Sequence, residues 1–388
     1  MKAVLLAAGG GRRLGPLTEH RPKPMIPVGN RPILESVLEA AVDVGVDEIV
    51  LVVGRGSERI QTHFGDGDDW GVEIEYVVQE HQLGAAHALS HVESVVDGHF
   101  FVLHGDQLVD AELLERLVDR WEETGLPTIA AVRSDRPTEY GAVEVHDGVV
   151  HAVSRSPTDD PPFLVNGGGY VFDERVFDVI HGMEETDDGD FGMATALQRL
   201  ADGHGLSAVL HRGSWQDLTY PWDLLTTNAT LVQDHERDGP AERSGVHDTA
   251  AVSRSVALDE GVSVGPNATL LSGTSLGSNV RVGANAVLSN CIVMAGARIG
   301  DGAVLQDTVV GEAAMIGPNV TAEGGPADVV IDDTVHRGVG LGGVVADHAT
   351  LGGNATVAPG AVVGCDVVAD GGTVLQGRIE SGETVRRA

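Results

Sequence analysis

The sequence predicts an α/β domain with a mostly parallel sheet, followed by an all-β left-handed parallel β-helix. Apolar strand-like runs alternate with helical patterns from residue 1 to about residue 228, as in parallel sheets covered by helices. A glycine-rich turn follows the first of these runs. Beyond residue 249 an aliphatic residue recurs every six positions, a period that helices and ordinary strands do not keep. These three observations define two domains, 1–228 and 249–377.

The elements of the first domain follow from their apolar periodicity. Its first strand is expected at residues 2–8, and ligands of such a sheet gather at the carboxyl ends of the strands. A polar connector is expected at 229–248, with a helix at 233–237. The remaining expected elements are helices at 31–44 and 58–64 and strands at 48–53, 73–78 and 99–103.

The six-residue period predicts that three hexads form each triangular coil of the β-helix, with the aliphatic side chain pointing to its axis. The frame is expected to shorten by one residue before Ile299 and before Val310, and an irregular insertion interrupts it near 324–336. A tail is expected at 378–388. The expected inward residues are Val264, Leu270, Leu276, Val282, Leu288, Met294, Ile299, Leu305, Val310, Ile316, Val339, Val345, Leu351, Val357 and Val363.

The glycine-rich turn is suited to binding a polyphosphate. Leu6 and Ala8 lie at the end of the first strand, and the three glycines Gly9 to Gly11 follow. Glycines allow a sharp turn, and the amides freed there can donate to phosphate oxygens. The turn is not a dinucleotide fingerprint, because Leu14 stands where the third glycine should be, nor a P-loop, because no lysine directly follows these glycines.

Positive charge accompanies this turn in a chain that is otherwise strongly acidic. The formal net charge of -33 is dispersed along the chain, which disfavours nucleic acid as a partner and is typical of a salt-rich cytoplasm. Arg12 and Arg13 follow the glycines, and Lys23 stands between two prolines. Lys2 is the chain's only other lysine, so the presence of Lys23 indicates chemistry at that position.

Composition also excludes several classes of protein. No apolar run has the length of a membrane span, and the first residues lack a signal-peptide pattern, so a cytoplasmic protein without a membrane partner is expected. Cys291 and Cys365 are far apart and have no metal-ligand pattern near them in the sequence. Neither a disulfide framework nor a structural zinc is therefore indicated.

Residues 6–28 resemble the signature of the sugar-1-phosphate nucleotidylyltransferases. They keep the family pattern L-A-A-G-x-G-x-R-L-x-P-L-T followed by R-P-K-P, with Arg12 where the family usually has threonine. The resemblance implies a Rossmann-like nucleotidyltransferase domain in which Leu6, Ala8, Gly9 and Gly11 contribute to nucleotide binding. It also implies that Arg13 holds the β- and γ-phosphates of a nucleoside triphosphate and that Lys23 holds the α-phosphate.

Later loops extend the resemblance to the base and the metal. Gln79, Gln82 and Gly84 match the family's base-recognition loop, although Ala85 replaces its threonine, and an amide side chain suits a pyrimidine edge. Asp106 follows a strand and a glycine, as does the family's first magnesium ligand. Asp217 lies in a segment like the family's W-x-D-x-G-x-P-x-D-L block and would be the second Mg²⁺ ligand.

The sugar side is implied by two shorter segments. Tyr140-Gly141 and Asn166 match the Y-G and N-x-G-x-Y motifs of the family, whose polar groups hold sugar hydroxyls. Where many relatives have E-K-P, Arg155 stands in place of the lysine and could hold the sugar phosphate in a bidentate manner.

The β-helix resembles the acetylating domain of bifunctional relatives but lacks its key residues. Asp301 and Val304 occupy the positions of the archaeal H-x-x-Y pair, and no lysine is left to bind coenzyme A. His336 and His348 remain as the candidate bases of such a site. We therefore expect an assembly domain that forms a homotrimer, as in relatives that pack three β-helices together.

The function that these resemblances lead us to expect is Mg²⁺-dependent nucleotidyl transfer from dTTP or UTP to glucose or N-acetylglucosamine 1-phosphate. Three alternatives stay open: a bifunctional enzyme that also acetylates glucosamine 1-phosphate, a mannose-1-phosphate guanylyltransferase, and a non-catalytic regulatory subunit. The presence of Arg13, Lys23, Asp106 and Asp217 argues against the regulatory subunit.

Overall fold

The chain folds into two compact units, described in a computed structural model for residues 1–134, 140–154, 163–183, 192–213, 215–234 and 245–387. The first unit comprises Met1–Gly10, Pro22–Met25 and Ile33–Asp217. The second comprises Gly11–Arg21, Ile26–Pro32 and Leu218–Ala388. Half of the glycine-rich loop therefore belongs to the same unit as the β-helix.

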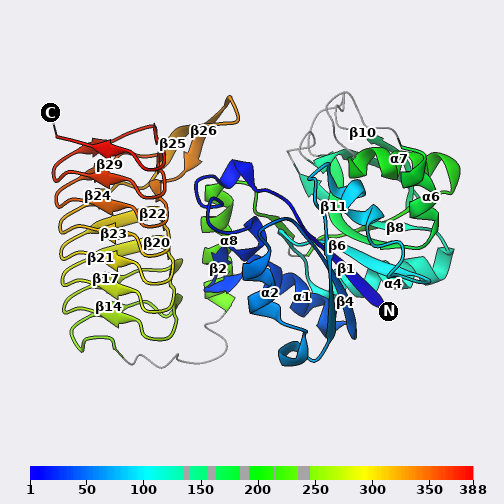
Figure 1. Cartoon of the computed structure of the whole chain (residues 1–388), viewed down its shortest axis with the longest axis horizontal. Helices are drawn as coiled ribbons and strands as arrows, with labels where there is room; N and C mark the ends of the chain where they lie inside the picture. Colours follow the sequence, from blue (N-terminus) through cyan, green and yellow to red (C-terminus); the bar gives the residue numbers. More distant parts are fainter. Residues whose placement is uncertain (135–139, 155–162, 184–191, 214, 235–244, 388) are drawn as a thin grey trace. The chain divides into compact units, whose positions relative to one another are not determined.

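A nine-stranded sheet forms the centre of the first unit, in the order β5-β4-β1-β6-β11-β8-β12-β10-β9 (Figure 1). Its first four strands pair in parallel, as the alternation of strands and helices predicts, whereas β11 is antiparallel to β6 and β8. The strands are β1 (Lys2–Ala7), β4 (Glu48–Val53), β5 (Glu73–Val78), β6 (Phe100–His104), β8 (Thr128–Ser134), β9 (Ala142–His146), β10 (Val149–Ser154), β11 (Phe163–Phe172) and β12 (Ser207–Leu210).

Helices cover both faces of this sheet. Along β1, Ala3 and Leu5 face one core and Val4 faces the other, which explains why the strand is apolar throughout instead of alternating. Helices α1 (Ile33–Asp43), α2 (Glu58–Phe64) and α4 (Ala111–Thr124) pack on the first face, and α3 (Ala85–Ser90), α6 (Arg175–His181) and α7 (Met193–Gly203) on the second.

Most of the expected elements are present at the expected residues. Strands β4 and β5 and helix α2 have the predicted bounds, and β6 lies one residue later than predicted. Helix α1 begins two residues late, because β3 (Arg31–Pro32) pairs with β2 (Pro27–Val28). Across the described ranges, no helix combines the length and the apolar character needed to cross a membrane.

The C-terminal part of the second unit is a stack of parallel coils with three strands each, as a left-handed β-helix requires (Figure 1). One face consists of β14 (Ala251–Val252), β17 (Thr269–Leu270), β20 (Val287–Val293), β22 (Val304–Val310), β24 (Thr321–Ala322), β29 (Thr356–Val357) and β32 (Val374–Leu375). The second face consists of β16 (Ser263–Val264), β19 (Arg281–Val282), β21 (Arg298–Ile299), β23 (Met315–Ile316), β28 (Thr350–Leu351), β31 (Val368–Ala369) and β34 (Thr384–Val385). The third consists of β15 (Val256–Leu258), β18 (Thr274–Leu276), the ends of β20 and β22, β27 (Gly343–Val345), β30 (Ala361–Val363) and β33 (Arg378–Ile379).

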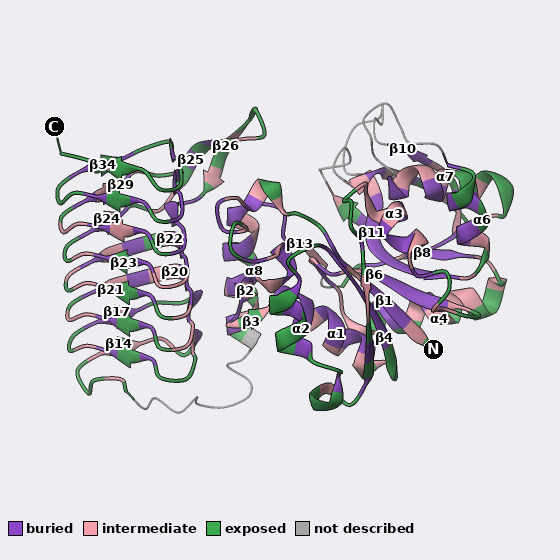
Figure 2. Cartoon of the chain, viewed as in Figure 1, coloured by how far each residue is buried: buried purple, intermediate pink, exposed green. Residues whose placement is uncertain are grey.

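Helix α8 (Pro221–Asp234) packs on the third face, against β15, β18, β20 and β22. Residues 233 and 234 of the helix expected at 233–237 form the end of α8, and residues 235–244 lie outside the described ranges. Outward side chains of this face, among them Ile292 and Val309, are consequently buried, whereas those of the first face are mostly half-buried and those of the second face mostly exposed (Figure 2).

The hexad frame holds except at two positions. Val293, not Met294, joins the core of the β-helix, so the frame already shortens at residue 293. Val339 lies outside the coils, on a hairpin made of β25 (Pro326–Ile331) and β26 (Thr334–Gly340). The two turn residues of this hairpin, Asp332 and Asp333, have φ angles of 48° and 58°, the left-handed geometry of a tight β-hairpin turn.

Candidate active site

Asp106 lies just beyond β6, at the carboxyl edge of the sheet, and pairs with Lys23. Lys23 Nζ donates a hydrogen bond of 2.5 Å to Asp106 Oδ2. Lys23 begins the short 3-10 helix η2 (Lys23–Met25), and its side chain is only 9% exposed. Gly105 permits this tight edge, because a Cβ there would lie 3.1 Å from Leu6 O. The structure thus brings together two predicted site residues that are 83 positions apart.

The charges around this pair favour an ionised Asp106 beside a neutral His104. Burial opposes the charge on Asp106, but the attraction and the hydrogen bond of Lys23 outweigh it and hold the pKa of the carboxyl below its usual value. Burial lowers the pKa of His104, although Asp106 and Asp217 both act to raise it. His104 therefore carries no charge at neutral pH, and Lys23 supplies the positive charge beside Asp106.

Asp217 lies in β13 (Gln216–Asp217), which pairs with β7 (Gln107–Leu108) directly after Asp106. Gln107 Nε2 donates to Asp217 Oδ1 at 3.1 Å, and the hydroxyl of Tyr140 donates to Asp217 Oδ2 at 2.9 Å. Gly168 makes room for this arrangement, because a Cβ on it would lie 1.5 Å from Gln107 Oε1. Two antiparallel strands thereby bring Asp217 beside the segment that carries Asp106.

The residues of this edge fit a divalent cation. Mg²⁺ prefers hard oxygen ligands, and Asp106 and Asp217 offer carboxylate oxygens. Gln107 Oε1 is buried and has no hydrogen-bond donor in the part of the chain that the structure describes. A buried acceptor in this state requires an explanation, and a bound cation or water is a common one. Gln107, which the motifs did not predict, thus places a buried amide beside Asp217.

The glycine-rich loop begins with space for a ligand. A Cβ added to Gly9 would meet nothing within 4 Å, so the protein's own packing does not require glycine there. At Gly10, in contrast, an added Cβ would lie 2.8 Å from Gln82 Oε1, so the Gln82 side chain would have to move. Gln82 Nε2 donates to Ala8 O at 2.7 Å, which fixes the end of β1, and Leu6 O accepts from the Gly105 amide. The bond from Gln82 to Ala8 thus fixes the position where the glycine-rich loop begins.

Gln79 is held in one orientation at the end of β5. Its Nε2 donates to Gly84 O at 3.2 Å and lies 2.8 Å from Nδ1 of His87. Because a carbonyl oxygen can only accept, the nitrogen end of the amide must face Gly84. Burial, followed by the charges of His91 and His81, lowers the pKa of His87, which keeps its Nδ1 available as an acceptor. Oε1 of Gln79 takes part in neither of these contacts.

The predicted sugar segments lie near Asp217. The ring of Tyr140 packs edge-on against Trp215 at 5.4 Å, and Trp215 Nε1 donates to Gly167 O. Gly141 has a φ of 86°, and its carbonyl accepts from the Asn166 amide at 3.0 Å. Arg155, the predicted ligand of the sugar phosphate, lies outside the described residues.

The side chain of Asn166 is engaged inside the protein. Its Nδ2 donates to the hydroxyl of Tyr170 at 2.7 Å, and its Oδ1 accepts from the Gly168 amide at 3.2 Å. Tyr170 is fully buried, and burial raises the pKa of its phenol. These bonds hold the irregular stretch of β11 between Asn166 and Tyr170. Asn166 therefore acts on the site by fixing the backbone conformation of this stretch.

Comparison with known protein families assigns the part of the chain that forms this site to a class of enzyme. Residues 2–234, more than half of the chain, match the family model for nucleotidyl transferase. The chain belongs to the nucleotidyl transferase family. Its members act on a nucleoside triphosphate and a sugar phosphate and commonly use a divalent metal. Residues 252–380 match the model of the GMPPB C-terminal domain.

Three curated relatives are similar to this nucleotidyl transferase over more than half of its length. The chain is 28% identical to "Bifunctional protein GlmU" of Methanococcus vannielii, over 98% of this chain and 96% of the relative. It is 35% identical to "Low-salt glycan biosynthesis nucleotidyltransferase Agl11" of Haloferax volcanii, over 67% and 73% of the two chains. It is also 35% identical to "UTP--glucose-1-phosphate uridylyltransferase AglF" of the same organism, over 58% and 93%. The protein is therefore a sugar-1-phosphate nucleotidyltransferase.

Arg13 and Gly11 belong to the second unit of this nucleotidyl transferase. Gly11 has a φ of 62° and precedes the 3-10 helix η1 (Arg12–Leu14). Arg13 Nε lies 3.5 Å from Oδ2 of Asp332 at the hairpin tip, and its guanidinium carbon lies 5.7 Å from the Tyr220 ring centre. His336 of the same hairpin packs against Tyr220 at 4.6 Å. The hairpin thus contacts the arginine that the motif assigns to the phosphates.

Replacing Asp332 by asparagine is expected to lower the KM for the nucleoside triphosphate about two- to fivefold. If Arg13 binds phosphate, as the motif predicts, Asp332 competes with it, and an exposed ion pair of this kind contributes up to about 1 kcal/mol. Steady-state kinetics in low and in molar KCl measures the effect, which should shrink as salt screens the pair. Asp333→Asn, at the neighbouring turn position, is the matched control. An increased KM in Asp332→Asn would contradict the prediction.

Sequence reasoning missed three residues of the site region. Gln107 could have been noticed, since it directly follows Asp106 in the sequence. His87 lies within the predicted base loop, but its role depends on the orientation of Gln79. Asp332 lies 319 positions from Arg13, and nothing local in the sequence predicts that contact.

Proposed function

We propose that the enzyme transfers a thymidylyl or uridylyl group from dTTP or UTP to glucose 1-phosphate or N-acetylglucosamine 1-phosphate and releases pyrophosphate. The orientation of Gln79 carries the choice of base. With Nε2 directed at Gly84 O and His87 Nδ1, the amide offers Oε1 as an acceptor. Uracil and thymine present an N–H at ring position 3, whereas cytosine has an acceptor there. The family's base-recognition motif at Gln79 supports this role.

The chemistry requires positioning and charge neutralisation more than a strong base. The sugar-phosphate oxygen is already anionic and attacks the α-phosphorus in line with the leaving pyrophosphate. Lys23 would shift its ammonium contact from Asp106 toward the α-phosphate. Arg13 is assigned to the β- and γ-phosphates by its position in the motif, and each such contact contributes on the order of a hundredfold in rate.

Asp106 and Asp217 would hold the Mg²⁺, with Gln107 Oε1 as a further oxygen beside them. When bound, Mg²⁺ neutralises phosphate charge and favours departure of pyrophosphate. The ionised state of Asp106 and the hydrogen bonds that orient Asp217 prepare both carboxylates for this role.

A substrate matrix tests the proposal. Five nucleoside triphosphates are combined with glucose, N-acetylglucosamine, glucosamine and mannose 1-phosphates in molar KCl, and released pyrophosphate is measured. The proposal predicts that UTP or dTTP with glucose or N-acetylglucosamine 1-phosphate exceeds every CTP and ATP combination at least tenfold. A preference for CTP or ATP would overturn the assignment of Gln79.

Guanylyl transfer to mannose 1-phosphate is the second candidate. It is favoured by the match of residues 252–380 to the GMPPB C-terminal domain, and guanine also presents a ring N–H that Gln79 Oε1 could accept. In the same matrix, GTP with mannose 1-phosphate would then give the fastest release of pyrophosphate.

We also expect that the β-helix does not transfer acetyl groups. His336 packs against the stacked rings of Tyr220 and Trp222, with ring centres 4.6 and 5.3 Å away, and the ring centres of His348 and His20 are 5.9 Å apart, so both candidate bases have packing roles. Incubation with acetyl-coenzyme A and glucosamine 1-phosphate should release no free thiol above background. Thiol release that His336→Ala abolishes would establish the bifunctional alternative.

The β-helix is instead expected to assemble a homotrimer. The outward side chains of its first face are uncharged, in a chain with 58 acidic residues. They are Ala251, Thr269, Val287, Val304, Thr321, Thr356 and Val374. Light scattering in molar KCl should give three times the mass of one chain, and dilute buffer should loosen the trimer. Val304→Asp should yield monomers, whereas Met315→Asp on the second face should not, and a monomeric unmodified chain would contradict the prediction.

A further inference from the structure

Stacked coils of the β-helix place three polar residues at one corner. Strands β22, β27 and β30 pair in parallel register, so the residues that follow them at equivalent positions lie one above another. These residues are Glu312, Asp347 and Cys365, and neighbouring coils are about 4.8 Å apart. Asp347 and Cys365 are each about 1% exposed.

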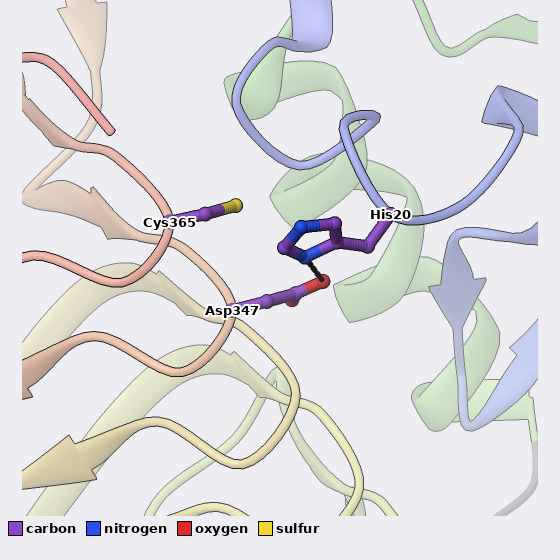
Figure 3. Close-up of side chains that lie close together, drawn as sticks. All are labelled: His20, Asp347 and Cys365. Carbon is purple, nitrogen blue, oxygen red and sulfur yellow. Dashed lines mark ion pairs between the residues drawn. The ribbon is translucent and has the colours of Figure 1, made fainter. Parts of the chain in front are cut away.

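Residues 16–21 lie along this corner within the second unit. Cys365 Sγ lies 3.5 Å from Pro16 O, and Arg21 Nη2 donates to Asp347 Oδ2 at 2.5 Å. The side chain of His20 points toward Asp347 and Cys365, as Figure 3 shows. The tertiary fold thus places a nitrogen, an oxygen and a sulfur ligand together, although the sequence around Cys365 has no metal-ligand pattern.

The distances suit a small tetrahedral ion. The three ligand atoms lie within 4.8 Å of one another, and His20 Nδ1 is 3.7 Å from Asp347 Oδ2. Ligands of a tetrahedral zinc are about 3.3–3.6 Å apart, given Zn–N and Zn–S bonds of about 2.0 and 2.3 Å. His20 is 40% exposed and lies on a loop, so a small rotation of its side chain can close the difference.

We propose that His20, Asp347 and Cys365 form a Zn²⁺ site. Imidazole and thiolate select zinc over Mg²⁺ or Ca²⁺, and three protein ligands leave a fourth position for water or chloride. On binding, the thiol of Cys365 releases its proton to solvent, and the metal takes its place on sulfur. This site is distinct from the hard oxygen set of Asp106 and Asp217.

The surroundings of the three ligands favour a divalent cation. Glu19, Glu312 and Asp347 contribute three negative charges and Arg21 one positive charge, which leaves a local charge of -2 when His20 is neutral. Asp347 is oriented by Arg21 and by the Glu312 amide, which donates to its Oδ1 at 2.8 Å. A carboxylate has about four lone-pair sites, so these two bonds leave capacity for a metal. Such outer contacts are typical of metal-ligating carboxylates.

A zinc ion here would fasten residues 16–21 to the β-helix corner. The loop is already held by Arg21 on Asp347 and by Ser381 Oγ, which donates to Glu19 Oε1 at 2.8 Å. The ion would add a third attachment of this loop to the β-helix, at His20. It should therefore raise the unfolding temperature of the second unit without taking part in nucleotidyl transfer.

Cobalt titration tests the site directly. The full chain is stripped with a chelator, transferred to metal-free molar KCl, and titrated with Co²⁺, whose bond to a thiolate gives a charge-transfer band in the near ultraviolet. One equivalent should produce the band, Zn²⁺ should displace it, and excess Mg²⁺ should not. Cys365→Ser should abolish the band, whereas Cys291→Ser, at the chain's other buried cysteine, should retain it.

A second variant keeps the test decisive if Cys365→Ser does not fold. His20→Ala changes a partly exposed side chain and should weaken Co²⁺ binding at least tenfold, while removing the rise in unfolding temperature that Zn²⁺ produces. The proposal is overturned if the unmodified chain shows no band, if the band persists in Cys365→Ser, or if His20→Ala binds Co²⁺ as tightly as the unmodified chain.

Discussion

Replacing Asp106 by asparagine is expected to reduce kcat by two to three orders of magnitude and leave the fold intact. Asparagine keeps the shape of the side chain but removes the charge that pairs with Lys23 at 2.5 Å and that would hold Mg²⁺. A loss of this size corresponds to about 3–4 kcal/mol of transition-state stabilisation. Asp217→Asn should have a similar effect, since it removes the second carboxylate. Pyrophosphate release at saturating substrate measures both.

Asp110→Asn is the matched control for the two aspartate variants. Asp110 caps helix α4 by accepting from the Leu113 amide, a role that asparagine can fill. It should therefore keep nearly full activity, and circular dichroism should show all three variants folded. If folded Asp106→Asn and Asp217→Asn both turned over like the unmodified chain, the metal assignment would be wrong.

Replacing Lys23 by arginine is expected to lower kcat about a hundredfold, although the chain uses arginine for almost all its other fixed positive charges. The ammonium of Lys23 is a compact charge in a nearly buried position, 9% exposed, against Asp106. A planar guanidinium is larger and presents its donors in a fixed fork, so it cannot make the same contact with Asp106 or with an α-phosphate. The kcat of Lys23→Arg is measured from pyrophosphate release at saturating substrate.

Lys2→Arg provides the control for this substitution, because Lys2 is the other lysine of the chain. Lys2 pairs with Glu48 at 3.1 Å near the start of β1, and this partly exposed contact can be made by arginine as well. We expect unchanged kinetics for Lys2→Arg. Equal turnover in Lys23→Arg and Lys2→Arg would show that Lys23 serves another purpose than contact with the α-phosphate.

The glycine-rich loop is divided between the two units, and the part from residue 11 onward belongs to the unit that contains the β-helix. Residues 11–21 pack with the coils and the hairpin, where Arg13 lies against Asp332 and Arg21 against Asp347. Arg21 is 2% exposed, and its Nη1 also contacts Met294. The β-helix therefore supports the segment that carries Arg13, in addition to its expected role in assembly.

The sequence by itself determined the features that depend on local spacing. The bounds of β4, α2 and β5 follow from apolar periodicity, because burial on one or both faces imposes a period on neighbouring residues. The hexads likewise identified the coil core, since every coil repeats the same inward position. The motifs at Lys23 and Asp106 were recognisable for the same reason, as each lies within a short segment of fixed composition.

Only the tertiary structure decided which distant residues meet. The frame shift at Val293 depends on how one strand pairs with both of its neighbours, and the pairing of Asp332 with Arg13 depends on where the hairpin points. Likewise, His20 meets Cys365 because the coils stack in register and residues 16–21 lie along one corner. The last two contacts join segments hundreds of residues apart, and the packing of the whole unit, not local composition, brings them together.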